Sequence, residues 1–337
     1  MRVRLKDIAN ATGFSTNTVS LALRKSPLVA EDTRDAILKA AADLKYRPNE
    51  IAKSLVSRET HSIGLVLTNI INPILTQTAR LVENALTARG YTTVFATSSN
   101  SIELEKKVIE AFCARQVDGI LIYPTDHHQI AHVSALADYN IPVVVLAARP
   151  PENINAVSLD ERLGAYRATR HLIELGHRRI GLVEGISNAD NLEKTQGYEL
   201  ALSESGIQSQ PGDIVKLEGF STPFGYEGMN ILMQQPDPPT AVFCVTDPLA
   251  IGVMEWCREH DLNVPGDISI IGFDNIEFAA YASTPLTTVA YDAHRLAYDA
   301  VDRLISIIKS GGTPPAPVHE IIEPEVLVRK STGKPRT

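Results

Sequence analysis

The chain has little of what marks disulfide-rich or metal-binding proteins. Its 337 residues include three cysteines, Cys113, Cys244 and Cys257, which lie far apart and form no CxxC pair. This odd and scattered set argues against both a disulfide framework and a zinc site. The apolar segments around Cys113 and Cys244 favour small buried side chains instead. We therefore expect no metal and no cofactor.

Long apolar runs are also absent. No run approaches the roughly 20 residues that a membrane helix needs, and the first residues, MRVRLKDIANATGF, lack the apolar region of a signal peptide. We expect a cytoplasmic protein with no part in a membrane. Common catalytic motifs are missing as well, because the sequence contains no G-x-S-x-G, Walker A or H-E-x-x-H pattern. We therefore expect no enzyme and assign no catalytic residue.

An excess of positive charge is missing from the chain as a whole, whose net charge is -8. The average hides a difference between the two ends. Residues 1–60 hold 11 Lys and Arg against 7 Asp and Glu, a balance of +4, whereas the remainder holds 21 against 33, or -12. A basic module on an acidic body is the division expected when one end meets phosphate, although solvated helices alone could produce a charge of this size.

Apolar residues near the N-terminus recur at helical spacing. The spacing predicts a helix around Leu5, Ile8 and Ala9, a second over Thr16–Arg24 and a third over about Asp32–Lys45. Two short helices joined by a glycine-containing turn and closed by a third are typical of a helix-turn-helix unit. A generic three-helix cap on the next domain is the alternative that the pattern leaves open.

The second helix is the one that can enter the major groove of DNA. Ser15 is placed to cap it, because its hydroxyl can accept from a free backbone N–H of the first turn. Thr16 and Asn17 come next on its exposed side. Asn can pair with adenine through two hydrogen bonds, and Thr can reach a base edge or a thymine methyl group.

A lone short helix is predicted after the interruption Tyr46-Arg47-Pro48-Asn49, over Glu50-Ile51-Ala52-Lys53-Ser54-Leu55-Val56. A helix of this length is not stable alone in water. It should form only when another surface packs on it, which is what a DNA-coupled hinge requires.

Two segments, LKDIANATGFSTNTVSLALR at 5–24 and YRPNEIAKSL at 46–55, resemble the headpiece and hinge helix of the LacI/GalR family of bacterial transcription regulators. The resemblance continues through SIGLVL, LGHRRIGLVEG, VFCVTDPLAIG, VPGDISIIGFDN and PLTTVAYD at matching spacings, and so covers nearly the whole chain. Each block alone is weak, but the ordered set is very specific.

The resemblance implies a dimer that binds a palindromic operator with two recognition helices and two hinge helices. It implies base contacts from Thr16 and Asn17, and a leucine wedge between base pairs from Leu55. The remaining DNA contacts that it implies are Ser15, Thr18, Ser20, Arg24, Asn49, Ala52 and Lys53. One departure is Leu21, where the family commonly has Arg, so one base contact is lost and Arg24 is the candidate to replace it.

From residue 62 onward, short apolar runs such as SIGLVLT, TTVFAT and DGILIYP alternate with helical stretches. The alternation predicts parallel sheets covered by helices, run through once to about residue 158 and then again. We expect a headpiece over 1–57 with a hinge helix over about 49–57, and a sensing domain over 58–337. This domain, similar to the periplasmic-binding-protein fold, has two doubly wound subdomains over about 62–159 with 291–321 and about 160–290 with 322–330.

A small-molecule effector is expected in the cleft between the subdomains, at the carboxyl ends of the strands. Asp274 can accept two hydroxyl groups, or it can cap a helix. Phe220 matches an aromatic residue that meets the sugar ring in relatives, or it packs in the core. Lys194 stands where Arg is usual, and Ala147 replaces an Asp of the lactose repressor. The other candidates are Thr68, Asn72, Thr246 and Asp247.

We therefore predict a sequence-specific DNA-binding repressor that acts as a homodimer and responds to an effector, with a carbohydrate as the first choice. The alternatives are a sugar-binding protein or a sugar-processing enzyme without regulatory DNA binding. The first would lack the headpiece, and the second would need a catalytic constellation. The sequence leaves open whether the effector acts as an inducer or as a corepressor.

Overall fold

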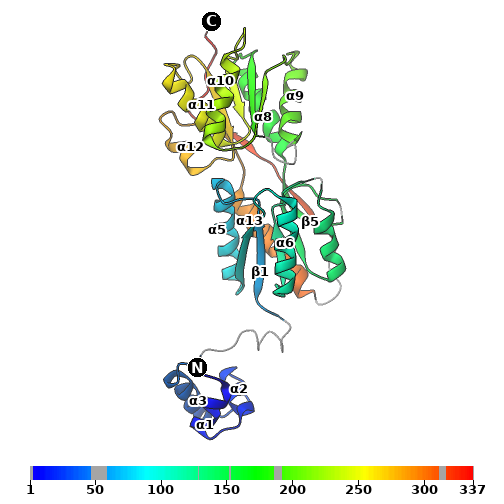
Figure 1. Ribbon diagram of the computed structural model, residues 1–337, viewed down its shortest axis with the longest axis vertical. Helices are drawn as coiled ribbons and strands as arrows, with labels where there is room; N and C mark the ends of the chain where they lie inside the picture. The colour runs from blue at the N-terminus through cyan, green and yellow to red at the C-terminus, as the bar shows by residue number, and fades with distance from the viewer. Residues whose placement is uncertain are drawn as a thin grey trace. The chain divides into compact units, whose positions relative to one another are not determined.

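The computed structural model describes residues 3–46, 59–127, 129–151, 153–185, 192–310 and 316–336. The chain divides into two compact units, Met1–Thr60 and His61–Thr337 (Figure 1). Among the described residues, no helix has both the length and the apolar character that crossing a membrane would require.

The first unit has three helices within residues 3–46: α1 (Leu5–Thr12), α2 (Thr16–Leu23) and α3 (Glu31–Asp43). Helix α1 ends at Gly13, which takes a left-handed φ of 74° and donates its N–H to the Ala9 carbonyl at 2.8 Å. Their core is formed by Ile8, Ala9, Val19, Ala22, Val29, Ile37 and Ala41. The predicted helix-turn-helix arrangement is confirmed.

The second unit contains two six-stranded sheets, each the centre of a lobe (Figure 1). The sheet of the first lobe has the order β11-β5-β4-β3-β1-β2. Its strands are β1 (Ser62–Leu67), β2 (Thr92–Thr97), β3 (Gly119–Ile122), β4 (Val143–Ala147), β5 (Asn155–Leu159) and β11 (His319–Ile322). Its helices are α5 (Pro73–Ala88), α6 (Ile102–Ala114), α7 (Ala131–Ser134), the 3-10 helix η1 (Ala135–Tyr139) and α13 (Ala293–Lys309).

The sheet of the second lobe has the order β12-β10-β9-β8-β6-β7, in which β12 alone pairs antiparallel. Its strands are β6 (Ile180–Gly185), β7 (Ile214–Leu217), β8 (Ala241–Cys244), β9 (Ser269–Phe273), β10 (Thr287–Ala290) and β12 (Glu325–Leu327). Its helices are α8 (Glu161–Glu174), α9 (Leu192–Glu204), α10 (Thr222–Met233), α11 (Asp247–Glu259) and α12 (Glu277–Tyr281). The predicted fold class, with two doubly wound parallel-sheet subdomains, is confirmed.

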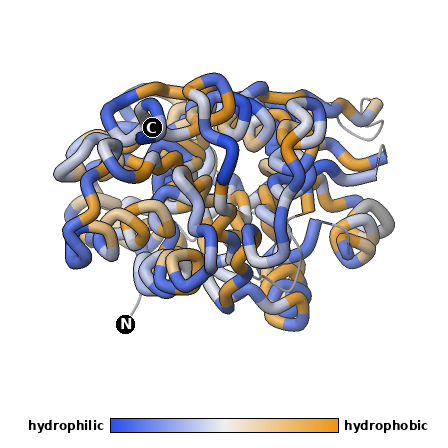
Figure 2. The backbone as a smooth tube through the Cα atoms, turned by 90° about the horizontal axis from the view of Figure 1, so that it is seen from above, coloured by the Kyte–Doolittle hydropathy of each residue, from blue (hydrophilic) through white to orange (hydrophobic). Residues whose placement is uncertain are grey.

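Helices cover both faces of each sheet, as nearly continuous apolar strands require. Helices α8 and α9 pack together in the second lobe, and α10 packs on α11. Figure 2 shows hydrophobic and hydrophilic residues alternating along the helices, so that each helix can turn an apolar side to a sheet. One buried cluster includes Leu67 and Ile74 of the first lobe together with Phe273 and Val289 of the second.

The chain passes from one sheet to the other at three points. β5 leads through Asp160 into α8, β10 leads through Tyr291 and Asp292 into α13, and β11 leads through 323–324 into β12. Because β5 and β10 run parallel to their neighbours, the carboxyl ends of the strands of both sheets face this boundary. In open α/β sheets this is the edge at which ligands bind.

Candidate DNA interface and effector site

Helix α2 of the first unit has one buried side and one exposed side. Val19 and Ala22 face the core, whereas Thr16 and Asn17 are exposed at the beginning of the helix. The predicted cap is confirmed, because Ser15 Oγ accepts from the Thr18 N–H at 3.0 Å. The polar end of α2 is therefore rigidly placed and free of the core.

Leu21 explains how a residue that lacks hydrogen-bonding capacity fits in this helix. It is half-buried and packs against the headpiece core. Arg24, one turn further, is exposed and donates from Nη2 to Ser20 Oγ at 2.8 Å and from Nε to the Ser20 carbonyl at 3.3 Å. The guanidinium group is thus held against Ser20, beside the exposed face.

DNA contacts from this helix remain predictions for Ser15, Thr16, Asn17, Thr18, Ser20 and Arg24. The hinge helix predicted over 49–57 lies outside the described residues, and with it the contacts predicted for Asn49, Ala52, Lys53 and Leu55.

At the boundary of the second unit, the first lobe places Thr68 and Asn72 directly after β1. Asn72 caps α5, since its Oδ1 accepts from the Ile74 N–H at 3.2 Å. Thr68 Oγ1 accepts from Asn69 Nδ2 at 3.4 Å. These hydrogen bonds remain within the first lobe, so both residues lie at the correct edge without joining the second lobe.

Lys194 is the centre of the second-lobe group. Its Nζ lies 3.2 Å from Glu161 Oε1, donates to the Val245 carbonyl at 3.1 Å and stands 4.1 Å from the centroid of the Phe273 ring. Burial disfavours the ammonium ion, but the nearby carboxylates of Glu161 and Asp274 outweigh it and raise the pKa of Lys194. The side chain therefore stays charged although it is 96 % covered, with 4 % of its surface exposed.

Asp274, directly after β9, is also buried, and its Oδ2 has no hydrogen-bond partner within the described part of the chain. Burial raises the pKa of Asp274 well above its usual range; Lys194 opposes this, and Asp247 and Glu161 reinforce it. A buried carboxyl group without a partner is costly, so a ligand that donates a hydrogen bond here would be bound favourably.

Asp247 and Thr246 are adjacent in sequence and differ in what they leave free. Asp247 is fully buried, and both of its carboxylate oxygens accept hydrogen bonds, from Thr288 Oγ1 and from the Ile276 N–H. Thr246 is buried with a hydroxyl group that finds no partner among the residues described. Of the two, Thr246 has the group that a ligand could use.

Phe220 follows β7 and is half-buried against the core. A Cβ atom at Gly185 would come within 2.7 Å of its ring, so the glycine at the end of β6 leaves the room that the ring occupies. The aromatic ring therefore lies over the carboxyl end of β6, at the same edge as Lys194.

Three residues at this boundary were not predicted from the sequence. Tyr123 follows β3, Tyr291 lies at the second crossover and Glu161 begins α8. Burial raises the pKa of Tyr123, and the charges of Asp274 and Glu161 raise it further, which places this first-lobe tyrosine near the second-lobe acids. Its hydroxyl lies beside Thr78 and Tyr291 without reaching hydrogen-bond geometry to any described residue. Their positions immediately after predicted strands were the feature that could have identified them.

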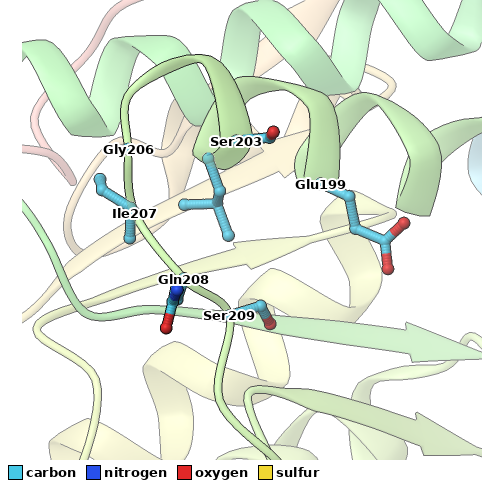
Figure 3. Close-up of a pocket in the computed structure, with 7 residues that line it drawn as sticks. Glu199, Ser203, Gly206, Ile207, Gln208 and Ser209 are labelled. Atoms are coloured by element: carbon cyan, nitrogen blue, oxygen red, sulfur yellow. The ribbon is translucent and has the colours of Figure 1, made fainter.

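Surface hollows lie elsewhere. One of about 490 Å³ is lined by Glu199, Leu202, Ser203 and 206–209 at the end of α9 (Figure 3). Another of about 470 Å³ lies between α8 and β12. Both are open to solvent, and neither includes the boundary residues. The buried groups without partners make the boundary the better candidate, because an open hollow offers water the same access as a ligand.

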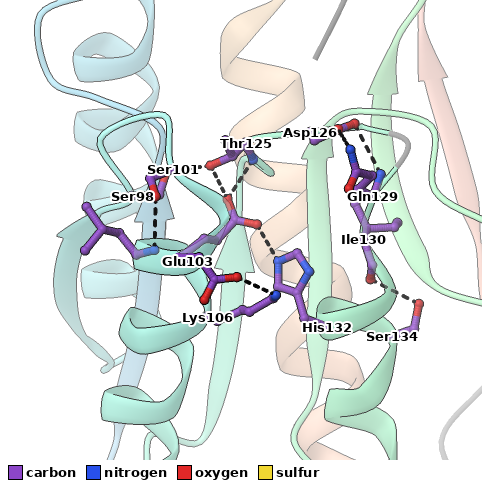
Figure 4. Close-up of polar contacts among 12 residues, drawn as sticks. Ser98, Ser101, Glu103, Lys106, Thr125, Asp126, Gln129, Ile130, His132 and Ser134 are labelled. Atoms are coloured by element: carbon purple, nitrogen blue, oxygen red, sulfur yellow. Dashed lines mark hydrogen bonds and ion pairs between the residues drawn. The ribbon is translucent and has the colours of Figure 1, made fainter. Parts of the chain in front are cut away.

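The first lobe has a buried carboxyl group of a different kind (Figure 4). Glu105 of α6 is fully buried and accepts from the Thr125 N–H and hydroxyl, both at 2.6 Å. Its other oxygen lies 2.6 Å from His132 Nε2. Thr125 Oγ1 is also 2.7 Å from Ser98 Oγ. Every oxygen of this carboxylate is satisfied, so the network joins loops after β2 and β3 without offering a free group.

Comparison with known proteins gives two family matches. Residues 4–49 match the model of "Bacterial regulatory proteins, lacI family", and residues 169–332 match that of "Periplasmic binding protein-like domain". The HTH-type transcriptional repressor PurR of Histophilus somni (strain 2336) is 35% identical over 332 residues, which cover 97% of this chain and 98% of that protein. PurR of Pasteurella multocida (strain Pm70) is 34% identical over 331 residues, with the same coverage.

Solved structures agree with these relatives. A lac repressor dimer bound to operator and the anti-inducer ONPF matches with a TM-score of 0.88 and 26% identity, over 99% of this chain and 100% of that one. A complex of the transcriptional regulator CelR with cellobiose matches with a TM-score of 0.72 and 28% identity, over 98% of this chain and 100% of that one.

Proposed function

Because the chain belongs to the lacI family of bacterial regulatory proteins, we propose that it represses transcription by binding a palindromic operator as a dimer, under the control of a small molecule. Its relatives are transcriptional repressors rather than enzymes, and DNA binding follows from the family. The observation that carries the proposal is the join of an exposed, capped recognition helix to a two-lobed unit with buried, partnerless polar groups at its boundary.

Helix α2 reads the operator in this proposal. Thr16 and Asn17 contact base edges, while Ser15, Thr18, Ser20 and Arg24 contact the backbone. The predicted hinge segment, with Leu55 as its wedge, enters the minor groove beside Asn49, Ala52 and Lys53. We retain the division into a headpiece over 1–57 and a sensing domain over 58–337 as part of the proposal.

A second copy of the chain is expected to cover an apolar surface of the second unit. Phe278 and Tyr281 of α12 are 63% and 81% exposed, and Ile70 and Ile71 before α5 are 55% and 81% exposed. Exposed aromatic and aliphatic groups of this size are typical of protein interfaces. Sedimentation of the wild type and of Tyr281→Asp checks this: we expect a dimer that the variant weakens, and a monomeric wild type would contradict it.

The effector is expected to be uncharged or cationic. In the sequence, the loops that follow β1 to β10 contain one Lys or Arg, Arg149, and its Nη2 is paired with Asp160 at 2.8 Å. Lys194 is paired with Glu161. A phosphate or carboxylate group would therefore meet Asp274 and Glu161 without a spare cation, whereas hydroxyl, N–H or ammonium donors would satisfy Asp274.

The chemical class of the effector stays a proposal. The carbohydrate first expected is one candidate, since the CelR neighbour holds cellobiose. A nucleobase or nucleoside is the other, because a planar ring with N–H donors could lie on Phe220 and donate to Asp274. The higher identity to the PurR proteins than to CelR gives the carbohydrate no preference.

Operator binding is tested by selecting duplexes from a random pool with the full-length protein at a stated salt concentration. We expect a palindromic site to be enriched, and we expect Asn17→Ala to lose it. Asn10→Ala, which removes the same amide from an exposed position of α1, is the matched control and should select the site of the wild type. Recovery of unrelated sequences by the wild type would overturn the proposal.

The effector class is tested by thermal unfolding with matched pairs of ligands, adenosine against AMP and glucose or cellobiose against glucose 6-phosphate. A ligand that binds only the folded state raises the unfolding midpoint by mass action. We expect a neutral member of the set to raise it and the phosphorylated forms to leave it unchanged. A larger rise with a phosphorylated form would contradict the proposed class.

A further inference from the structure

The segment Asp274–Ile276, directly after β9, has an unusual backbone. Asp274 has a φ of 107° and Asn275 a φ of 52°, both in the left-handed region that favours glycine. Two adjacent non-glycine residues persist there only when their surroundings hold them, and such backbone strain collects at ligand sites. The question is therefore what holds this segment.

Side chains from two other elements hold its N–H groups. Asp247, at the beginning of α11, accepts from the Ile276 N–H at 2.8 Å and from Thr288 Oγ1 at 2.5 Å. Thr288 of β10 in turn accepts from the Asn275 N–H at 3.3 Å. The two side chains thus form one connected set of hydrogen bonds beneath the segment.

A third side chain reaches the segment from the C-terminal stretch of the chain. Arg329, just beyond β12, donates from Nη2 to Asn275 Oδ1 at 2.6 Å and from Nη1 to the Leu286 carbonyl at 2.7 Å. Its own N–H donates to Thr287 Oγ1 at 3.0 Å. The guanidinium group therefore fixes Asn275 to the loop that precedes β10.

Gly272 of β9 shows that the sequence leaves room for this arrangement. A Cβ atom at Gly272 would lie 2.2 Å from Asp247 Oδ1, closer than any side chain could tolerate. Asp247 can therefore lie against β9 only because the strand has a glycine at this position.

We propose that Asp247, Thr288 and Arg329 are positioning residues that hold the backbone of Asp274 so that its carboxyl group can meet the effector. This inference rests on the proposed function of Asp274. It gives Asp247 a different role from the direct effector contact predicted from the sequence, because Asp247 has no exposed surface and both its oxygens are occupied. The three side chains bind the segment and leave Asp274 Oδ2 without a partner in the described chain.

Hydrogen–deuterium exchange of the full-length protein tests whether these side chains hold the segment. Thr288→Val removes the bridging hydroxyl group at similar size, and Thr288→Ser keeps it. We expect exchange within 272–278 to be about tenfold faster or more in Thr288→Val, as the loss of one hydrogen bond predicts, and close to wild type in Thr288→Ser. Thr169→Val, which removes another buried hydroxyl group of this lobe, is the control and should leave 272–278 unchanged.

Ligand binding tests whether the hold matters to the effector. Calorimetry with cellobiose and with adenosine on the same variants should show binding about tenfold weaker in Thr288→Val and in Arg329→Met, with Thr288→Ser and Thr169→Val near wild type. Unchanged exchange in Thr288→Val, or faster exchange with unchanged binding, would overturn the inference. If the wild type binds neither probe, the proposed effector classes fail, and the exchange experiment still decides whether the side chains hold Asp274.

Discussion

The two lobes of the second unit share one strand order and differ in the chemistry at their boundary. Strand for strand, β11-β5-β4-β3-β1-β2 corresponds to β12-β10-β9-β8-β6-β7. The crossovers correspond as well: Asp160 after β5 accepts from the Leu163 N–H, and Asp292 after β10 accepts from the Arg295 N–H. The scaffold is thus used twice, with the same cap at each passage between lobes.

The difference appears at the ends of β4 and β9, which occupy equivalent places in the two sheets. Ala147 ends β4 with a φ of 59°, and Asp274 follows β9 with a φ of 107°. One position has a methyl group, and the other has a buried carboxyl group. The first lobe's own buried carboxylate, Glu105, is fully satisfied within that lobe. The comparison indicates that stability alone explains Glu105, whereas Asp274 needs a ligand to explain it.

The largest expected effect is the removal of the second-lobe cation. Lys194→Met leaves Glu161 and Asp274 buried without their positive neighbour, so we expect the free energy of unfolding to fall by about 3 to 5 kcal/mol. Urea denaturation at neutral pH measures it. Arg170→Met, which breaks the exposed pair with Glu174, is the control and should change little. A change in Lys194→Met no larger than in this control would show that the second-lobe group is not a charged unit.

A smaller effect is expected from the first-lobe carboxylate. Glu105→Gln places an amide group among the hydrogen-bond donors Thr125 and His132, which should cost about 1 to 3 kcal/mol in the free energy of unfolding. Ligand binding by the same variant should match the wild type, because Glu105 has no free oxygen. Glu103→Gln, on the exposed side of α6, is the control. If Glu105→Gln weakened ligand binding as much as a change at Asp274, the distinction between the lobes would fail.

The smallest effect is on the pH dependence of stability. Burial raises the pKa of Asp247 to about 7 from an ordinary 3.8, while Thr288 and the Ile276 N–H lower it. Because the folded state binds this proton more tightly, Asp247 contributes stability below pH 3.8 that is lost as the pH rises through about 7. Asp247→Asn removes this titration. We expect its unfolding midpoint to fall less than that of the wild type over that range, and parallel curves would contradict the assigned shift.

Much of the fold could be predicted from the sequence, because strong apolar runs and caps act locally. The Ser15 cap, the end of α1 at Gly13 and the long buried strands needed no tertiary information. The short strands β11 and β12, with half-exposed residues, were less visible because their pairing depends on distant partners. Helix α3 also ends at Asp43, before the predicted Lys45.

The candidate site was predicted in its positions more than in its roles. Strand ends identify Lys194, Thr246 and Asp274 because ligands bind at that edge. The role of Asp247 could not be read in this way, since it depends on Thr288 and Ile276, which are remote in sequence. Glu161 and Tyr123 were missed for the same reason, because only the packing of the lobes brings them to Asp274.

Operator affinity of the wild type and of Asp274→Asn, measured by fluorescence anisotropy with and without the ligand that most stabilises the wild type, tests the central claim directly. Asn tolerates the positive φ of this position, so the backbone should survive the change. The account predicts that the ligand shifts the operator Kd of the wild type by about tenfold or more and leaves that of the variant unchanged. An equal shift in both proteins would contradict it.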